Sequence, residues 1–473
     1  MSLFRTKPLA ALLSQAADGD KGLKRTLTAS NLIALGVGAI IGAGLFVRTA
    51  AAAAEASGPA VTLSFIVAAL GCLFAGLCYA EFASMIPISG SAYAYSYVTM
   101  GEFVAWTIGW ALVLEYALGA ATVAIAWSEY LNKLTGGAIP PEWCHSPMEG
   151  GIFNLPAVFI LLLLTMLLIK GTQESATVNS VIVCVKVTIV LIFIAVGWQF
   201  INGANHTPYM IPEGTVGHEG FFQHGWGGVL RGAGIVFFAF IGFDAVSTAA
   251  QEAKRPEKDM PIGILGSLAV CTVLYILFGH VLTGVANWTE FKTAGKEASV
   301  AFAIQNHMPG YGWLATAITV AILAGFSSVI LVMLLGQSRV FYSMAKDGLL
   351  PPIFAELHPK FRTPHKSNWL LFVFVGLFAG FIPGSLAGDL TSIGTLFAFV
   401  VVSLGVMIMR KSNPSTPRPF RTPLVPIVPL LGVLVCSLMI ISLDTFTQLV
   451  AAGWMLIGFV VYFTYSRSHS KLN

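Results

Sequence analysis

Stretches of about 20 predominantly apolar residues recur along nearly the whole chain, and this feature leaves few folds open to it. A helix of about that length crosses the hydrocarbon core of a bilayer. In lipid, only helices and closed barrels satisfy all of their backbone hydrogen bonds. We therefore predict an all-α integral membrane protein with about twelve transmembrane helices. Their predicted centres are Ile41, Leu70, Val113, Leu162, Val187, Ala239, Leu274, Ser328, Val375, Val400, Leu431 and Leu456.

Composition excludes the main alternatives to a membrane protein. Charged residues make up 10% of the chain and hydrophobic residues 56%, which leaves too few polar side chains to cover a water-soluble surface. The same values exclude intrinsic disorder. The net charge of +4 does not indicate nucleic-acid binding, because the basic residues report membrane topology instead. Five cysteines, Cys72, Cys78, Cys184, Cys271 and Cys436, lie in apolar stretches and are predicted to be buried packing residues.

Basic residues predict the orientation of the helices. Most of the 26 lysine and arginine residues fall in the tails and in loops on one side of the predicted bundle. The positive-inside rule assigns that side to the cytoplasmic face of a cell membrane. An even number of crossings then puts both termini in the cytoplasm. The predicted segments are a cytoplasmic tail (1–27), two five-helix inverted repeats (28–202 and 203–411), two peripheral helices (412–466) and a second tail (467–473).

The first predicted helix carries a cluster of glycines in the segment Gly36–Phe46. Glycine weakens a helix, and small residues also let membrane helices pack closely. The cluster therefore fits either a packing face or a broken helix whose exposed N–H groups could hold a substrate carboxylate.

The sixth predicted helix favours the second reading. It repeats the glycines at Gly232, Gly234 and Gly242 and adds a carboxylate, Asp244, in mid-span. Two glycine-interrupted helices at equivalent places in two halves indicate a transporter site near the bilayer midplane. Five intervening crossings reverse the chain direction, which suits an inverted repeat.

The motifs in these two helices resemble those of the amino acid–polyamine–organocation superfamily, and most of all its cationic amino acid transporter subfamily. The segments that carry the resemblance are Gly42–Phe46, Phe240–Asp244 and Gln251–Ile264, supported by Tyr79–Glu81, Pro87–Tyr93 and Ala345–Pro351. Ile88 stands where many relatives have a basic residue. The chain lacks the last two helices of animal members, which suggests a bacterial homologue.

The resemblance implies ten core helices in two inverted halves, two peripheral helices, and a substrate site between helices one and six. The substrate carboxylate would meet N–H groups of Gly42, Ala43 and Gly44. Its ammonium group would meet carbonyl groups of Ile41, Phe238, Ala239 and Ile241, with Ile40 and Phe237 beside them. A zwitterion among apolar helices needs this pairing of N–H dipoles at one end and unpaired carbonyls at the other.

Lys186 lies in the middle of the fifth predicted helix, 9 residues from Thr177 and 12 from Trp198. These separations correspond to about 13 and 18 Å at the helical rise, and a lysine side chain of roughly 6 Å does not reach either interface. A charged lysine there needs a partner or must lose its proton. It fits proton coupling or a fixed structural ion pair. Similar transporters with a lysine at this place are proton-coupled, and the resemblance to them implies that Ser327 and Ser328 are its hydrogen-bond partners. The alternative for the two serines is a role in packing helices together.

Glu115 and Asp244 are the other carboxylates expected in mid-membrane. Glu115 fits a protonated structural carboxyl, a proton relay or a contact to substrate. Asp244 fits a cap of the broken helix. Metal sets and catalytic motifs are not evident, so neither an enzyme nor a cofactor is expected.

The resulting hypothesis is a proton-coupled symporter that imports amino acids by alternating access. Bulky Phe237, Phe238 and Phe240 and the positive Lys186 favour small neutral substrates such as alanine; Glu115 favours cationic substrates, arginine or lysine. The expected partners are the amino acid, protons and the lipid bilayer, with room for an accessory small membrane subunit. A sensor that binds without transport remains an alternative.

Overall fold

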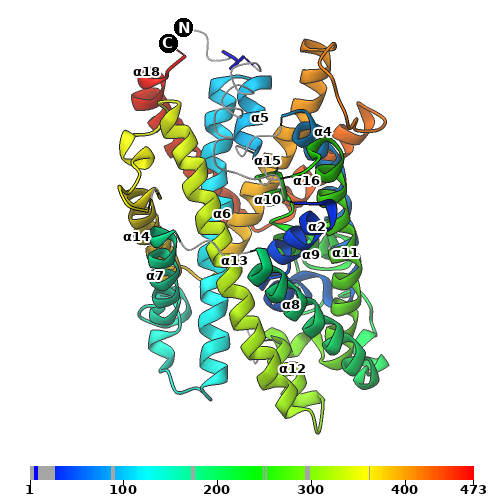
Figure 1. Cartoon of the computed structure of the whole chain (residues 1–473). Coiled ribbons are helices and arrows are strands. Elements are labelled where there is room, and N and C mark those ends of the chain that lie inside the picture. Colours follow the sequence, from blue (N-terminus) through cyan, green and yellow to red (C-terminus); the bar gives the residue numbers. More distant parts are fainter. Residues whose placement is uncertain are drawn as a thin grey trace.

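The protein is a bundle of helices, described here from a computed structural model that covers residues 5–8, 27–86, 91–171, 176–248, 250, 253–292, 299–361 and 363–472. Across these ranges the backbone is helical apart from its connections, and the only β contact is an isolated bridge between Leu27 and Ala253. The all-α membrane fold class is thereby confirmed. The two ends of the chain lie together at one end of the bundle (Figure 1).

The first half of the chain contains an interrupted helix followed by long continuous ones. Helix one is α2 (Ala29–Ile40) and, beyond a break, the turns η1 (Gly44–Arg48), α3 (Thr49–Ala52) and η2 (Ala53–Ser57). The helices that follow are α4 (Val61–Met85), α5 (Ser91–Thr99), α6 (Glu102–Leu134), α7 (Leu155–Lys170) and α8 (Ala176–Gly197).

The second half begins with another interrupted helix. Helix six consists of α9 (Gly225–Phe237), the 3-10 turn η9 (Phe238–Phe240) and, after a break, α10 (Ala245–Thr248). The remaining helices are α11 (Pro256–Val285), α12 (Ser299–His307), α13 (Gly312–Lys346), α14 (His365–Phe381), α15 (Gly384–Ser412), α16 (Ile427–Ser442), α17 (Thr445–Val461) and α18 (Arg467–His469).

Seven helical segments of the described chain are long and apolar enough to cross a membrane, and four shorter ones are apolar as well. Each predicted centre lies in a helical segment or at the break of helix one. The number of crossings and the division into inverted halves stay predictions. The motif residues Ile88, Gln251 and Glu252 lie outside the described ranges.

The core of the bundle forms around α6. In its most apolar stretch 94% of the residues are buried, because α13 and α15 pack along it, whereas only 22% are buried in the segment containing α17. Small residues such as Ala117, Gly119 and Ala120 allow this close packing. Helix one packs on α11, and both α11 and the first segment of helix six, α9, pack on α4. The two interrupted helices therefore lie inside the bundle.

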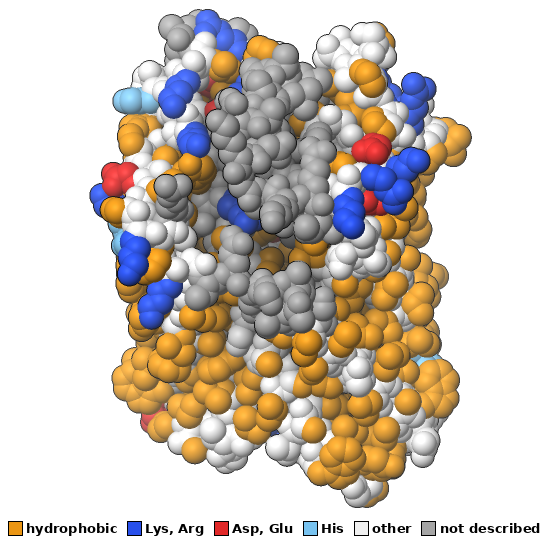
Figure 2. All heavy atoms as spheres, viewed as in Figure 1, with side chains coloured by type: hydrophobic (Ala, Val, Ile, Leu, Met, Phe, Trp, Pro, Cys, Tyr) orange, Lys and Arg blue, Asp and Glu red, His pale blue; other side chains and the backbone are white. Residues whose placement is uncertain are grey.

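The outer surface separates charge from apolar groups along the bundle. On the face in Figure 2, lysine and arginine side chains gather toward the end where the termini lie, and the described surface toward the other end is mostly hydrophobic. Such a band is what contact with lipid requires. Cys184 is exposed rather than buried, so the prediction of a packing role was wrong there; the other four cysteines predicted to pack are buried. Its helix, α8, is largely uncovered by neighbouring helices, since only 33% of its span is buried.

Candidate functional site: two helix breaks inside the bundle

Helix one is interrupted at Ile41 and Gly42. Ile41 has an extended backbone (φ −72°, ψ 104°), and helical structure resumes at Gly44. Within the described chain, the N–H groups of Gly42 and Ala43 donate to no backbone carbonyl. The break also removes the bond that Gly38 would otherwise accept from Gly42, four residues on. The break thus leaves two backbone donors unpaired and releases one backbone acceptor inside the bundle.

Helix six is interrupted at Ile241–Asp244. Ile241 is extended (φ −60°, ψ 132°), and Gly242 has φ +115°, a conformation that favours glycine. A Cβ atom at Gly242 would also lie 3.1 Å from the Ala39 carbonyl group, so the same glycine lets the break approach helix one. The sequence-based expectation that both helices are interrupted thus matches the backbone.

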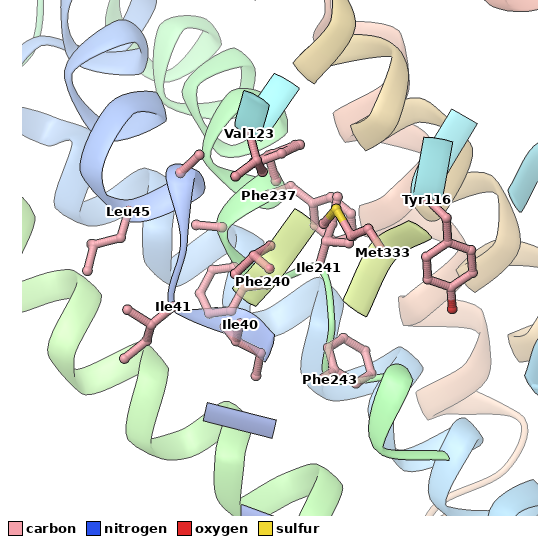
Figure 3. Close-up of a cluster of buried hydrophobic side chains, with 14 of the residues drawn as sticks. Ile40, Ile41, Leu45, Tyr116, Val123, Phe237, Phe240, Ile241, Phe243 and Met333 are labelled. Carbon is pink, nitrogen blue, oxygen red and sulfur yellow. The ribbon is translucent and has the colours of Figure 1, made fainter. Parts of the chain in front are cut away.

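The two breaks are in direct contact. A Cβ atom at Gly44 would lie 2.1 Å from the Cα atom of Ala239, so the backbones touch. The Tyr275 hydroxyl of α11 lies 3.0 Å from the Ile40 carbonyl oxygen and 2.8 Å from that of Ala239. Its single proton is shared between one carbonyl on each interrupted helix. Figure 3 shows Ile40 and Ile41 beside Phe240 and Ile241, with Phe237 and Met333 nearby.

Every residue expected to bind substrate is buried. Nine of them belong to the two interrupted helices: Ile40, Ile41, Gly42, Ala43, Gly44, Phe237, Phe238, Ala239 and Ile241. The tenth, Glu115, lies on α6. Tyr275 was not anticipated. A tyrosine in the middle of an apolar helix needs a partner for its hydroxyl, and that signal could have identified it.

Lys186 reaches helix one from α8. Its side chain is 3% exposed, and its Nζ donates to the Gly38 carbonyl oxygen at 2.9 Å. This is the acceptor that the break releases. Gly325 of α13 makes room for the side chain, because a Cβ there would lie 2.8 Å from Lys186 Cε. A narrow cleft lined by Ile41, Phe46 and Phe326 adjoins the lysine.

The two serines expected beside Lys186 lie on α13. Ser327 is half-buried, and its hydroxyl donates to the Leu323 carbonyl oxygen of the same helix at 2.9 Å. Ser328 is buried. A hydrogen bond from either serine to Lys186 stays a prediction.

Glu115 and Asp244 are neighbours. Both are fully buried, and the Tyr116 hydroxyl donates to Asp244 Oδ2 at 3.0 Å. The Glu115 carboxyl group lies beside Asp244 and Thr395, and neither of its oxygens accepts a hydrogen bond within the described chain. Glu115 is thereby grouped with the break of helix six, whereas Lys186 is grouped with helix one.

An ion pair joins helix one to α15 on the side of the breaks away from the termini. The guanidinium group of Arg48 donates to the Asp389 carboxylate, and both side chains are buried. Gly388 gives the guanidinium space, since a Cβ there would lie 3.1 Å from Arg48 Cζ. No local pattern in the sequence pairs Arg48 with a residue 341 positions away.

The other end of the bundle is held by the chain termini. Lys7 Nζ contacts Asp347 Oδ1 at 2.8 Å, and the Tyr93 hydroxyl donates to Asp347 Oδ2 at 2.9 Å. The backbone N–H of Lys471 donates to the Asp347 carbonyl oxygen. Contacts therefore hold the bundle together both above and below the breaks.

A bundle of membrane-length helices with two breaks in contact at its centre is the architecture of a membrane transport protein. The chain belongs to the amino acid permease family, which matches residues 27–465, within the amino acid–polyamine–organocation superfamily. The resemblance stated from the motifs is confirmed.

Similar proteins are found over the whole length. The branched-chain amino acid permease BcaP of Bacillus subtilis (strain 168) is 43% identical, covering 100% of this chain and 99% of that protein. The methylthioribose transporter of the same organism is also 43% identical, with the same shares covered. The chloroplastic cationic amino acid transporter 9 of Arabidopsis thaliana is 39% identical over 87% of this chain and 72% of its own length.

Proposed function

We propose that the protein is a proton-coupled importer that moves amino acids across the cell membrane by alternating access, with both termini in the cytoplasm. Residues 28–202 and 203–411 would form the two inverted halves, and 412–466 the peripheral helices. The observation that carries the coupling is the contact between Lys186 Nζ and the Gly38 carbonyl oxygen. It places a titratable group from α8 directly on the interrupted helix.

Substrate would bind where the two breaks now touch. Its carboxylate would accept from the N–H groups of Gly42, Ala43 and Gly44, which sit at the start of a helical segment. Its ammonium group would meet carbonyls of Ile41, Phe238, Ala239 and Ile241. Because the backbones at Gly44 and Ala239 are in contact, binding requires helices one and six to separate. The Tyr275 hydroxyl would then give up its shared position between them.

Lys186 would couple proton movement to the motion of helix one. A hydrogen bond made by a charged group contributes about 1.5–3 kcal/mol, and a neutral one about 0.5–1.5 kcal/mol. Deprotonation would thus weaken the hold of α8 on helix one by about 1–1.5 kcal/mol, roughly a tenfold change in a conformational equilibrium. Loss of the proton would weaken the contacts among α8, helix one and α13. The site would then open toward the cytoplasm.

The Glu115–Asp244 pair supports a second place for a proton on this route. Two fully buried carboxyl groups side by side do not both carry charge, so the pair holds at least one proton. The pair joins α6 to the break of helix six. A change in its protonation would act on helix six as Lys186 acts on helix one.

Small neutral amino acids such as alanine are the substrates we favour. Glu115 lies beside Asp244, and two buried carboxyl groups this close carry at most one negative charge between them, which is a weak site for a cationic side chain. Met333 fills the space next to α6, where a Cβ at Gly119 would lie 2.8 Å from its sulfur atom. The names of the relatives support two further candidates, branched-chain and cationic amino acids. Competition of alanine, leucine and arginine for uptake of labelled alanine would rank the three classes.

The decisive experiment is uptake into proteoliposomes with an imposed pH gradient, acidic outside. The wild-type protein should accumulate alanine when the gradient is present, and a sodium gradient alone should not replace it. Lys186→Met should abolish the response to the pH gradient. Lys170→Met is a matched control, because Lys170 ends α7 and lies away from the breaks. Gradient-driven accumulation that survives Lys186→Met would refute the coupling.

A further inference from the structure

A connecting segment, residues 203–224, covers the end of the bundle opposite the termini. It leaves α8 through the η7 turn (Gly203–His206), and its last turn, η8 (Phe221–Gln223), packs against both α9 and η2. The packing is close: a Cβ at Gly227 would lie 1.9 Å from the Phe221 carbonyl oxygen. A Cβ at Gly228 would lie 2.1 Å from that of Ala56. The segment thus lies over the ends of helices one and six.

His218 fastens this segment to its neighbours. Its imidazole is 1% exposed, Nδ1 lies 3.0 Å from the Gln223 carbonyl oxygen, and Nε2 lies 2.8 Å from Lys292 Nζ. The Trp288 ring meets it edge-on at 5.6 Å. A lysine ammonium group only donates and a carbonyl only accepts, so Nε2 accepts and the single ring proton is on Nδ1. The contacts therefore fit the neutral imidazole alone.

Burial and the two cations that face His218 disfavour its charged form, whereas the backbone groups of Gln223 and Glu55 favour it, and the net effect is against the charge. Lys292 faces it from the turn η11 (Trp288–Lys292) and Arg231 from α9, while η2 presents the backbone of Glu55. Burial, and then the charge of Lys292, lower the pKa of His218 from its usual value. Within residues 212–224, the other titratable groups are Glu213 and Glu219, which are exposed, and His224, which is half-buried.

We propose that the contact between His218 and Lys292 is pH-sensitive and holds residues 212–224 over helices one and six. The contact is released when the face of the bundle opposite the termini is acidified. A proton on Nε2 removes the acceptor that Lys292 uses and places a second positive charge against it. The released segment keeps the ordinary histidine affinity for protons, and the docked segment has a lower one. Docking is therefore strongest above about pH 6.5 and weakens as the pH falls below that value.

The expected size of the effect follows from the same linkage. At pH 5.5 a free histidine with a pKa of about 6.5 is about 90% protonated, so the equilibrium for release rises by up to about tenfold relative to pH 7.5. This rise applies whichever solute the protein carries. The proposal goes beyond the proposed transport function and does not depend on the roles of Lys186 or Glu115.

Hydrogen–deuterium exchange of the whole protein in lipid nanodiscs tests the proposal without substrate or gradient. After correction for the intrinsic effect of pH, exchange in peptides covering residues 212–224 should rise severalfold from pH 7.5 to 5.5. His218→Gln keeps an acceptor for Lys292 but does not titrate, so its exchange should stay flat. Lys292→Met removes the opposing charge and should weaken the response to acid.

His206→Gln is the matched control. His206 lies in the same segment and its pKa is also lowered, first by burial, but it faces the His280 carbonyl group and Thr283 rather than a lysine. This variant should keep the wild-type response. A response that is equal in wild type and His218→Gln, or that is lost in His206→Gln alone, would overturn the proposal. Because the readout is local exchange, failure of proton-coupled uptake would leave it unaffected.

Discussion

Gly44→Ala tests whether the contact between the two helix breaks is required for transport. The new Cβ atom would lie 2.1 Å from Ala239 Cα and 2.6 Å from its N atom, where ordinary contact begins at 3.4 Å. Both neighbours are backbone atoms, so no side-chain rotation relieves the clash. Helices one and six would have to move apart by about 1.3 Å.

The energetic cost follows from comparable overpacking. Insertion of a methyl group into a close-packed interior costs about 1–3 kcal/mol. At 1.4 kcal/mol per factor of ten, the state with touching breaks would be populated about fivefold to about 150-fold less. If each transport cycle passes through that state, the rate of uptake should fall by a similar factor.

Uptake into proteoliposomes measures the effect, and a thiol-reactive dye checks that the variant is folded. Cys72, Cys271 and Cys436 are buried and react only when the bundle opens, whereas Cys184 is exposed from the start. Gly376→Ala is the matched control: the nearest atoms to its Cβ would lie 3.7 and 3.9 Å away. Its uptake should stay within about twofold of the wild type. A folded Gly44→Ala protein that transports as fast as Gly376→Ala would refute the reasoning.

Two further changes probe the contacts around the breaks. Tyr275→Phe removes the hydroxyl that competes with substrate for the Ala239 carbonyl group, so the apparent affinity for substrate should rise. One neutral hydrogen bond corresponds to a rise of about twofold to tenfold. Unchanged affinity in an uptake titration would contradict this. Arg48→Met leaves the Asp389 carboxylate buried without its partner and should destabilise the protein by about 3–5 kcal/mol. The double variant with Asp389→Leu should recover most of that loss in thermal unfolding, and equal losses in the single and double variants would argue against a paired role.

Local patterns in the sequence were sufficient for much of the site. The breaks of helices one and six follow from glycines such as Gly42 and Gly242, because backbone preference is a property of a residue and its immediate neighbours. The burial of Lys186 follows from its distance to both ends of its apolar stretch. The membrane fold class follows from the length of the apolar stretches, since lipid allows few backbone structures.

Contacts between distant segments depended on the tertiary structure. Periodicity does not tell which carbonyl group Tyr275 reaches, and Ala239 lies 36 residues before it. The position of Asp244 next to Tyr116, 128 residues away, and the pairing of Arg48 with Asp389 depend on how whole helices are placed in the bundle. The sequence by itself indicates which segments are long and apolar enough to cross a membrane and where two of them are interrupted. Which polar groups meet was decided only by packing, because a buried donor pairs with whatever acceptor the neighbouring helix presents.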